Sequence, residues 1–285
     1  MSALHKVVPA SEIRKHLSKT AKRIWCPGCG TAIAMGGMIR AMVESKIPEK
    51  EFAVITGIGC TGRAHAYVDY DSLQTPHGRT LPVATGIKLA RPGMHLIVFS
   101  GDGDLLGIGG NHFIHAARRN IGITVVLVNN FIYGMTGGQV APTTPTADTA
   151  STAPYGNLEE PFDTCALAMA AGATYVARTT AYHVRQMVDF IGEGIKNKGF
   201  SVIEVLSNCT TQYGRMNRKG SSAQMLKWFQ KNSVSLKKAA DLPPEKLSGK
   251  FITGEFVTGK RGELSARYHE LITQKNKERV DAHEA

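Results

Sequence analysis

The sequence predicts an α/β protein with an open, mostly parallel sheet and helices on both faces. Two observations lead to this prediction. Continuous apolar runs recur along the chain, and each has the length of one strand. Segments with helical character separate these runs, as the crossovers between parallel strands require. Because the runs are continuously apolar, the strands are expected to be buried on both faces of the sheet.

The expected elements follow one another in a regular order. A basic, partly helical lead-in covers 1–24. Apolar strands that end in polar or glycine-rich loops are expected within 52–63, 94–104 and 123–138. A helix over 107–120 separates the last two of these strands. Later elements are a helix and then a strand over 161–178, an amphipathic helix over 181–199 and a buried strand over 200–209. The Thr- and Pro-rich stretch 141–157 predicts a long surface loop, a kind of loop that is often functional.

Composition and charge narrow the class of protein. The 285 residues are 42% hydrophobic, which allows a substantial core. We predict one α/β domain over 1–215 and a charged extension over 216–285. From Arg215 onward there are fifteen Lys/Arg and eight Asp/Glu, so seven of the eleven net positive charges lie there. Such a surface attracts an acidic partner, although a solvated tail would have the same composition.

Targeting signals and disulfides are not expected. No apolar run reaches the roughly 18 residues of a membrane helix, and the first residues lack the apolar stretch of a signal peptide. We therefore predict a cytoplasmic protein with no membrane association. The five cysteines are odd in number and scattered, which favours metal ligands or free thiols over a disulfide framework.

A metal-binding turn is predicted near the N-terminus. Cys26 and Cys29 flank a Pro-Gly pair, as in a metal knuckle. A zinc ribbon would need a second close pair about 15–20 residues later, and none follows. An iron–sulfur cluster or zinc bound by distant cysteines remains open at this point. A zinc-ribbon nucleic-acid binder is the alternative from another class, but no aromatic residues cluster in a basic patch.

A second motif indicates a diphosphate site. The sequence GDG at 101–103 is followed, after 26 residues, by Asn130 of an NN pair. A carboxylate and an amide oxygen at strand ends suit Mg²⁺, and the glycines let backbone N–H groups approach phosphate oxygens. The spacing is typical of thiamine-diphosphate enzymes. The alternative is a glycine turn together with an asparagine that caps a helix.

The combined motifs carry a family resemblance over about residues 20–215. The segments WCPGCG, GIGC, HGRTLPVATGIKLARP, FSGDGDLLGIGGNHFIHAARRN and NNFIYGMTGGQ resemble the β subunit of 2-oxoacid:ferredoxin oxidoreductases, most closely the 2-oxoglutarate type. This resemblance implies a thiamine-diphosphate-binding fold and a reversible, coenzyme-A-acylating oxidation of 2-oxoglutarate. Pyruvate or another 2-oxoacid is the alternative substrate.

The resemblance also implies residue roles. Mg²⁺ would be held by Asp102, the Asn130 side chain and the Ile132 carbonyl. His77 would lie near the thiazolium as a catalytic group, where the residues alone indicate only a loop histidine. The implied cofactor contacts are Ile58, Gly59, Cys60, Thr61, His77, Gly101, Asp102, Gly103, Asp104, Asn130, Gly134 and Met135.

One [4Fe–4S] cluster is expected on four of the five cysteines. Cys60 and Cys209 lie in loops at strand ends, whereas Cys165 lies in an apolar helix and is expected to be a buried thiol. The family pattern has its ligands at the positions of Cys26, Cys29, Cys60 and Cys209. Because Cys60 follows Gly59, the cluster and the thiamine would be neighbours.

A partner chain is expected on chemical grounds. Thiamine diphosphate needs a carboxylic acid at its pyrimidine ring as a proton relay. Only about 100 residues precede the GDG motif, too few for another domain of ordinary size beside the knuckle. A larger α subunit would then supply this glutamate, in a heterodimer or a dimer of heterodimers. The resemblance implies a 2-oxoacid and coenzyme A as substrates and ferredoxin as electron acceptor.

Overall fold

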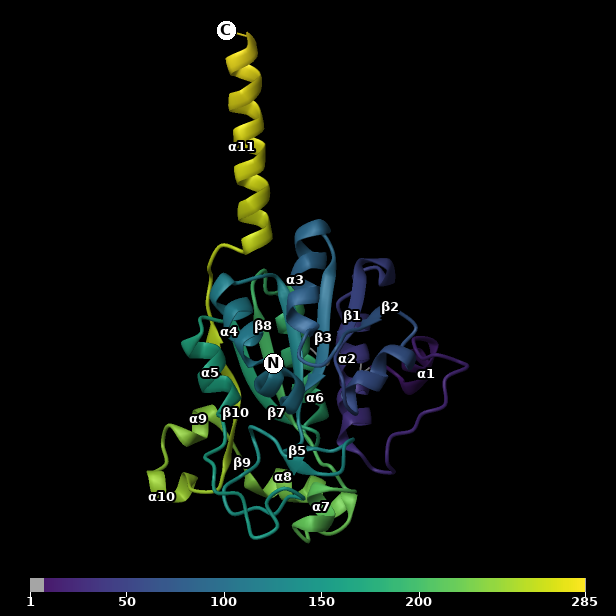
Figure 1. Cartoon of the computed structure of the whole chain (residues 1–285). Helices are drawn as coiled ribbons and strands as arrows, with labels where there is room; N and C mark the ends of the chain where they lie inside the picture. The colour runs from purple at the N-terminus through teal and green to yellow at the C-terminus, as the bar shows by residue number, and fades with distance from the viewer. Residues whose placement is uncertain (1–7, 285) are drawn as a thin grey trace, which may run out of the picture.

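A computed structural model describes residues 8–284 of the chain (Figure 1). The first seven residues of the predicted lead-in, and Ala285 of the predicted extension, lie outside the described residues. Eight strands form one sheet in the order β2-β1-β3-β4-β8-β7-β10-β9. The strands are β1 (Phe52–Thr56), β2 (Asp71–Gln74), β3 (His95–Gly101), β4 (Ile123–Asn129), β7 (Tyr175–Thr180), β8 (Ser201–Leu206), β9 (Ser233–Ser235) and β10 (Phe251–Thr258).

The prediction of a mostly parallel sheet is confirmed. All neighbours from β2 to β7 are parallel, and only β10 runs antiparallel to its neighbour β7. The helices are α1 (Ala10–Lys15), α2 (Gly30–Glu44), α3 (Thr80–Ala90), α4 (Gly110–Arg119), α5 (Thr164–Ala170), α6 (Val184–Lys196), α7 (Tyr213–Met216), α8 (Ser222–Asn232), α9 (Leu236–Ala239), α10 (Pro244–Leu247) and α11 (Leu264–Glu284).

Two apolar layers cover the two faces of the sheet. Helices α2 and α6 pack on one face, where Phe99 of β3 belongs to the same core cluster as Met38 and Met187. Helices α3, α4 and α5 cover the other face, where the neighbouring Val98 packs with Phe113. Successive residues of a strand therefore enter different cores, which explains why these strands are continuously apolar. Burying each such side chain contributes about 1.5–3 kcal/mol.

The region after β3 differs from its prediction. The segment Gly103–Ile108 forms a π-helical turn, η3, and α4 begins only at Gly110. The helix predicted from residue 107 therefore starts later, because the π turn occupies its first residues. π-Helical turns are rare and often occur at functional sites. This one starts directly after Asp102, at the carboxyl end of β3.

The loop after β4 is less exposed than predicted. A short antiparallel pair, β5 (Ile132–Tyr133) and β6 (Gln139–Val140), precedes it. Within the loop, Thr143 and Thr144 are buried, and the Thr144 hydroxyl donates to the Phe131 carbonyl over 2.6 Å. The prediction of a long surface loop over 141–157 was wrong for these residues, because their hydroxyls satisfy groups at the end of β4.

The C-terminal residues contribute to the sheet. Strand β10, which the sequence analysis did not predict, pairs with β7 and also with β9. Helix α11 then extends away from the body of the molecule (Figure 1). None of the helices in the described part of the chain is both long and apolar enough to cross a membrane.

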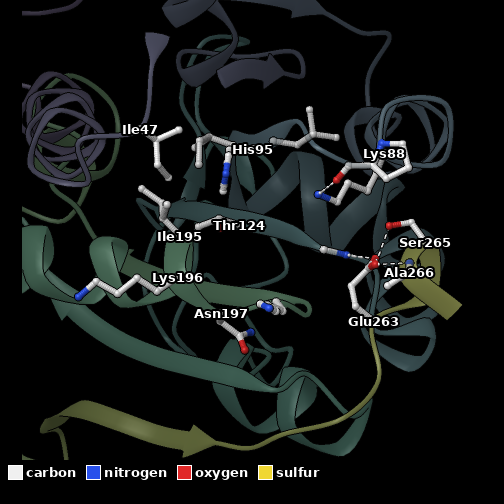
Figure 2. Close-up of a pocket in the computed structure, with 15 residues that line it drawn as sticks. Ile47, Lys88, His95, Thr124, Ile195, Lys196, Asn197, Glu263, Ser265 and Ala266 are labelled. Carbon is white, nitrogen blue, oxygen red and sulfur yellow. Dashed lines mark hydrogen bonds between the residues drawn. The ribbon is translucent and has the colours of Figure 1, made fainter. Parts of the chain in front are cut away.

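A hollow of about 350 Å³ lies at the amino ends of β3, β4 and β8 (Figure 2). Two of its charged groups, Lys88 and Glu263, are engaged by the chain itself. Lys88 Nζ donates to the Pro92 and Met94 carbonyls at 2.8 Å each. Glu263 Oε1 accepts from the Gly122 N–H at 2.8 Å, and its Oε2 accepts from the Ala266 N–H at 2.8 Å. The Glu263 contacts fasten the start of α11 to the beginning of β4.

Candidate active site

A smaller hollow, of about 90 Å³, lies at the opposite, carboxyl edge of the sheet. It is formed where β1, β3 and β4 end in polar loops, the place where open α/β sheets bind ligands. All the residues predicted to contact the cofactor line it. The lining residues are Ile58, Gly59, Cys60, Thr61, His77, Gly101, Asp102, Gly103, Asp104, Asn130, Ile132, Tyr133, Gly134, Met135 and Thr136.

Asp102 is a buried carboxylate whose surroundings suit a bound cation. The residue is only 2% exposed. Burial raises the pKa of its carboxyl to about 6, although hydrogen bonds from Thr143 and the nearby backbone oppose the rise. No Lys, Arg or His lies within ion-pair distance of it in the part of the chain that the structure describes. A divalent cation would supply the missing positive charge, so Asp102 fits Mg²⁺.

The asparagine pair lies across from Asp102. Phe131 adopts a positive φ of 65°, which a bulky residue rarely does, and this turns the chain sharply after Asn130. The turn brings the Ile132 N–H to the Asn130 side-chain oxygen at 3.2 Å. Asn130 and Ile132 therefore both line the hollow beside Asp102. Their amide and carbonyl oxygens are of the type that Mg²⁺ prefers.

Thr143 connects the two strand ends. Its hydroxyl oxygen lies 2.5 Å from Asp102 Oδ2 and 2.9 Å from Asn129 Oδ1. Asn129 in turn donates to Glu204 Oε1 at 2.8 Å, and Glu204 pairs with Arg178. The sequence reasoning missed Thr143. Its only signal was its place in the long loop that follows β5 and β6.

Asp104 connects the loop that contains Ile58 with the loop that contains His77. Its Oδ1 accepts from the Gly78 N–H at 2.8 Å and the Ile58 N–H at 3.2 Å, and it contacts His77 Nδ1 at 2.5 Å. Its Oδ2 accepts from the Ser100 hydroxyl at 2.7 Å. The carboxylate is 1% exposed and is used within the chain. Asp104 thus fixes the His77 ring at the rim of the hollow.

Three loops bring the predicted cluster ligands together. Cys29 caps α2, Cys60 precedes the short 3₁₀ helix η2 (Thr61–Ala66), and Cys209 follows β8. A Cβ added to Gly134 would lie 3.5 Å from Cys209 Sγ and 3.7 Å from Cys60 Sγ. These two thiols therefore flank Gly134, which also lines the 90 Å³ hollow.

The electrostatics of the thiols fit a polynuclear cluster. Burial, with smaller contributions from the neighbouring Cys29, Cys209 and Cys26, raises the pKa of Cys60 to about 12. Burial also raises the pKa of Cys29, with smaller contributions from Cys209 and Cys26. Buried thiols such as Cys29 and Cys60 ionise only beside positive charge. Among the described residues, no three His, Cys, Asp or Glu side chains close on a single metal ion.

The fifth cysteine is separate from this group. Cys165 is 1% exposed on α5, and its Sγ lies 3.6 Å from Glu204 Oε2. It packs with the apolar side chains under α4 and α5. The expectation of a buried thiol is confirmed.

The comparisons with known proteins agree with this geometry. Residues 57–205 match the family described as thiamine pyrophosphate enzyme, C-terminal TPP binding domain. The 2-oxoglutarate synthase subunit KorB of Methanocaldococcus jannaschii is 51% identical over 87% of this chain and 92% of that protein. The KorB subunit of Methanothermobacter marburgensis is 48% identical over 89% of each chain.

The chain belongs to the β subunits of 2-oxoacid:ferredoxin oxidoreductases. A β subunit of this name from Aeropyrum pernix is 42% identical over 68% of the chain. One chain of a solved 2-oxoglutarate:ferredoxin oxidoreductase from Magnetococcus marinus, with 2-oxoglutarate, coenzyme A and succinyl-CoA bound, superposes with a TM-score of 0.83. That match has 31% identity and covers 95% of this chain and 94% of that one. The hollow at the carboxyl edge therefore lies in the thiamine-diphosphate-binding domain of this β subunit.

Proposed function

We propose that this β subunit, with a larger partner subunit, oxidises 2-oxoglutarate and coenzyme A to succinyl-CoA and CO₂ and passes the electrons to ferredoxin. The observation that carries the proposal is the meeting of Asp102, Asn130 and the four cysteines at one edge of the sheet. The names of the relatives at 46–51% identity support 2-oxoglutarate as the substrate. The reaction is reversible, and the same residues serve both directions.

The diphosphate end of the cofactor fits the carboxyl edge. Asp102, the Asn130 side chain and the Ile132 carbonyl would hold Mg²⁺. Gly101 and Gly103 line the hollow without side chains, so their backbone can approach phosphate oxygens. A side chain at Gly103 would also collide with the Tyr133 ring. When bound, thiamine diphosphate supplies a nucleophilic carbon and an electron sink for the decarboxylation. The role of this chain is to anchor and orient that group.

His77 would act on the substrate side of the site. Its Nδ1 faces the buried Asp104, so the ring orientation is fixed and Nε2 is free to hold or move a proton. The His77 side chain is 35% exposed, which gives it access to a reactant in the hollow. A ring held in this way loses little freedom when the substrate binds.

The cluster would receive the electrons. Cys26, Cys29, Cys60 and Cys209 would ligate one [4Fe–4S] cluster, and Gly134 lies between its site and the diphosphate site. The absence of a side chain at Gly134 shortens the path between the two groups.

Two features support a partner subunit. The hollow is too small for a whole cofactor, since ligand pockets usually enclose about 300–1,000 Å³, and no glutamate lines it among the described residues.

The test is an anaerobic purification of the chain with whatever binds it. We expect about four iron and four sulfide per chain, bound thiamine diphosphate and a larger partner. The complex should reduce methyl viologen with 2-oxoglutarate only when coenzyme A is present, and more slowly with pyruvate. A chain that purifies alone with zinc and no thiamine would overturn the proposal.

A further inference from the structure

The positive charge of the chain is concentrated in two segments. Residues 13–43 contain six Lys/Arg and no Asp/Glu, and residues 205–240 contain seven Lys/Arg and no Asp/Glu. These thirteen charges exceed the net charge of +11. The rest of the chain has 21 Lys/Arg against 23 Asp/Glu and is slightly acidic. The basic character of the protein therefore belongs to these two segments alone.

The fold brings the two segments together at the knuckle. The Gly28 carbonyl, in the turn between Cys26 and Cys29, accepts from Ser222 Oγ at 2.6 Å and from Asn208 Nδ2 at 2.8 Å. The Gly30 N–H donates to the Asn208 carbonyl at 3.1 Å. The first segment supplies Cys26 and Cys29, and the second supplies Cys209. The parts of the two acid-free segments that contain the cysteines are thus in direct contact.

An exposed surface surrounds the knuckle, and we name it the knuckle face. It consists of Lys22, Arg23, Ile24, Cys26, Arg215 and Arg218, all of them exposed. Ile24 is 61% exposed and is the one large aliphatic residue of this face. Arg215 and Arg218 line an open hollow of about 690 Å³ together with Thr210 and Thr211, directly after Cys209.

The positive charges of the knuckle face are free to act on a partner. Lys219, nearby, is already engaged by Asp148 at 3.8 Å and by the rings of Tyr213 and Trp228. Within residues 8–284, no carboxylate lies within ion-pair distance of Lys22, Arg23, Arg215 or Arg218. An unpaired cationic rim of this kind steers an acidic partner toward the surface.

We propose that the knuckle face is where the small acidic iron–sulfur acceptor docks. This inference rests on the proposed function, because it needs a cluster at the cysteines. Cys26 is exposed on this face, so a cluster ligand there would be accessible to a docked protein. One apolar residue within a charged rim suits a transient electron-transfer contact of less than about 1,200 Å². An obligate subunit interface would be larger and more apolar.

The test uses the complete enzyme with its partner subunit and two electron acceptors. An acidic ferredoxin reports docking, and methyl viologen reports the chemistry without docking. The variants are Lys22→Glu with Arg23→Glu, and Arg215→Glu with Arg218→Glu. The control is Lys237→Glu with Lys238→Glu, an equal charge change at exposed residues of α9, which lies well away from α7 (Figure 1).

For the knuckle-face variants we expect the KM for ferredoxin at low salt to rise about tenfold or more. Its dependence on ionic strength should weaken, while the viologen rate stays at the wild-type value. The control should behave as wild type with both acceptors. Equal ferredoxin kinetics in all variants would overturn the docking site, and so would loss of the partner subunit from the knuckle-face variants. A wild-type complex that reduces neither acceptor would instead overturn the proposed function.

Discussion

The two edges of the sheet use their polar residues in different ways. At the amino edge, the 350 Å³ hollow contains Lys88 and Glu263, and hydrogen bonds to the chain itself satisfy both (Figure 2). At the carboxyl edge, the hollow has only about a quarter of that volume. Yet it contains the buried Asp102, whose charge has no cationic partner among the described residues.

The difference shows that volume alone does not identify the reactive end of this fold. Charged groups that hold loops in place, such as Glu263, contribute to stability. Groups that are buried without a counter-charge are costly unless a ligand completes them. Asp102 is of this second kind, and it marks the carboxyl edge as the site. The following variants test that division.

The largest effect is expected from Asp102→Asn. The change removes the carboxylate from the cation site while the side chain keeps its shape. Loss of an outer hydrogen-bond partner already costs about 10–100-fold in metal affinity, so loss of a direct ligand should cost more. Thiamine diphosphate content after desalting should fall to near zero, and turnover of 2-oxoglutarate should fall with it. Full cofactor retention would place the cation elsewhere.

A matched pair of cysteine variants comes next. Cys60→Ala should abolish the visible absorption of the cluster and lower the iron content, because a proposed ligand is lost. Cys165→Ala should keep iron and activity and cost about 1 kcal/mol of unfolding free energy, since it removes one buried heavy atom. Equal iron loss in both variants would show that Cys165 also serves the cluster.

Thr143 offers a finer test at the carboxyl edge. Thr143→Val keeps the shape but removes the hydroxyl that contacts Asp102 and Asn129. We expect about 10–100-fold weaker Mg²⁺-dependent activation, measured by titration of the stripped enzyme with the metal at saturating thiamine diphosphate. Thr143→Ser should restore wild-type activation. Weak activation in the serine variant as well would point to packing as the cause.

The smallest effect on catalysis is expected at the amino edge. Glu263→Ala removes the acceptor for the Gly122 and Ala266 N–H groups. Urea denaturation should show a loss of about 1–3 kcal/mol, the cost of partly buried donors left without partners. The rate of 2-oxoglutarate oxidation per folded complex should stay at the wild-type value. A fall in the rate would show that the two edges are coupled.

The sequence predicted those parts that follow from local pattern. The buried strands were predictable because each side of β3 and β4 contributes to an apolar core. The GDG and NN motifs were predictable because they stand at the carboxyl ends of adjacent parallel strands, which must meet at one edge. The same argument predicted that Cys60 and Cys209 would lie close together.

Other features depend on contacts far apart in the sequence. Thr143 lies 41 residues from Asp102 and carries no motif, so only the folded loop reveals its contact. The π turn after Asp102 replaces a helix that local propensity allows. Strand β10 has a weak apolar pattern, and it becomes a strand because β7 offers an unpaired edge. The two acid-free segments can be identified in the sequence. Only the fold shows that they meet beside Cys26 and Cys29.

Helix α11 is expected to unfold separately from the body of the chain. It extends away from the body over 21 residues, and Tyr268, Leu271 and Ile272 on it are about half exposed (Figure 1). A helix with little tertiary packing is marginal in water and frays at free energies far below global unfolding. In the isolated subunit, heating should therefore melt this helix first and the sheet later. The helical signal and the core signal then report two transitions instead of one.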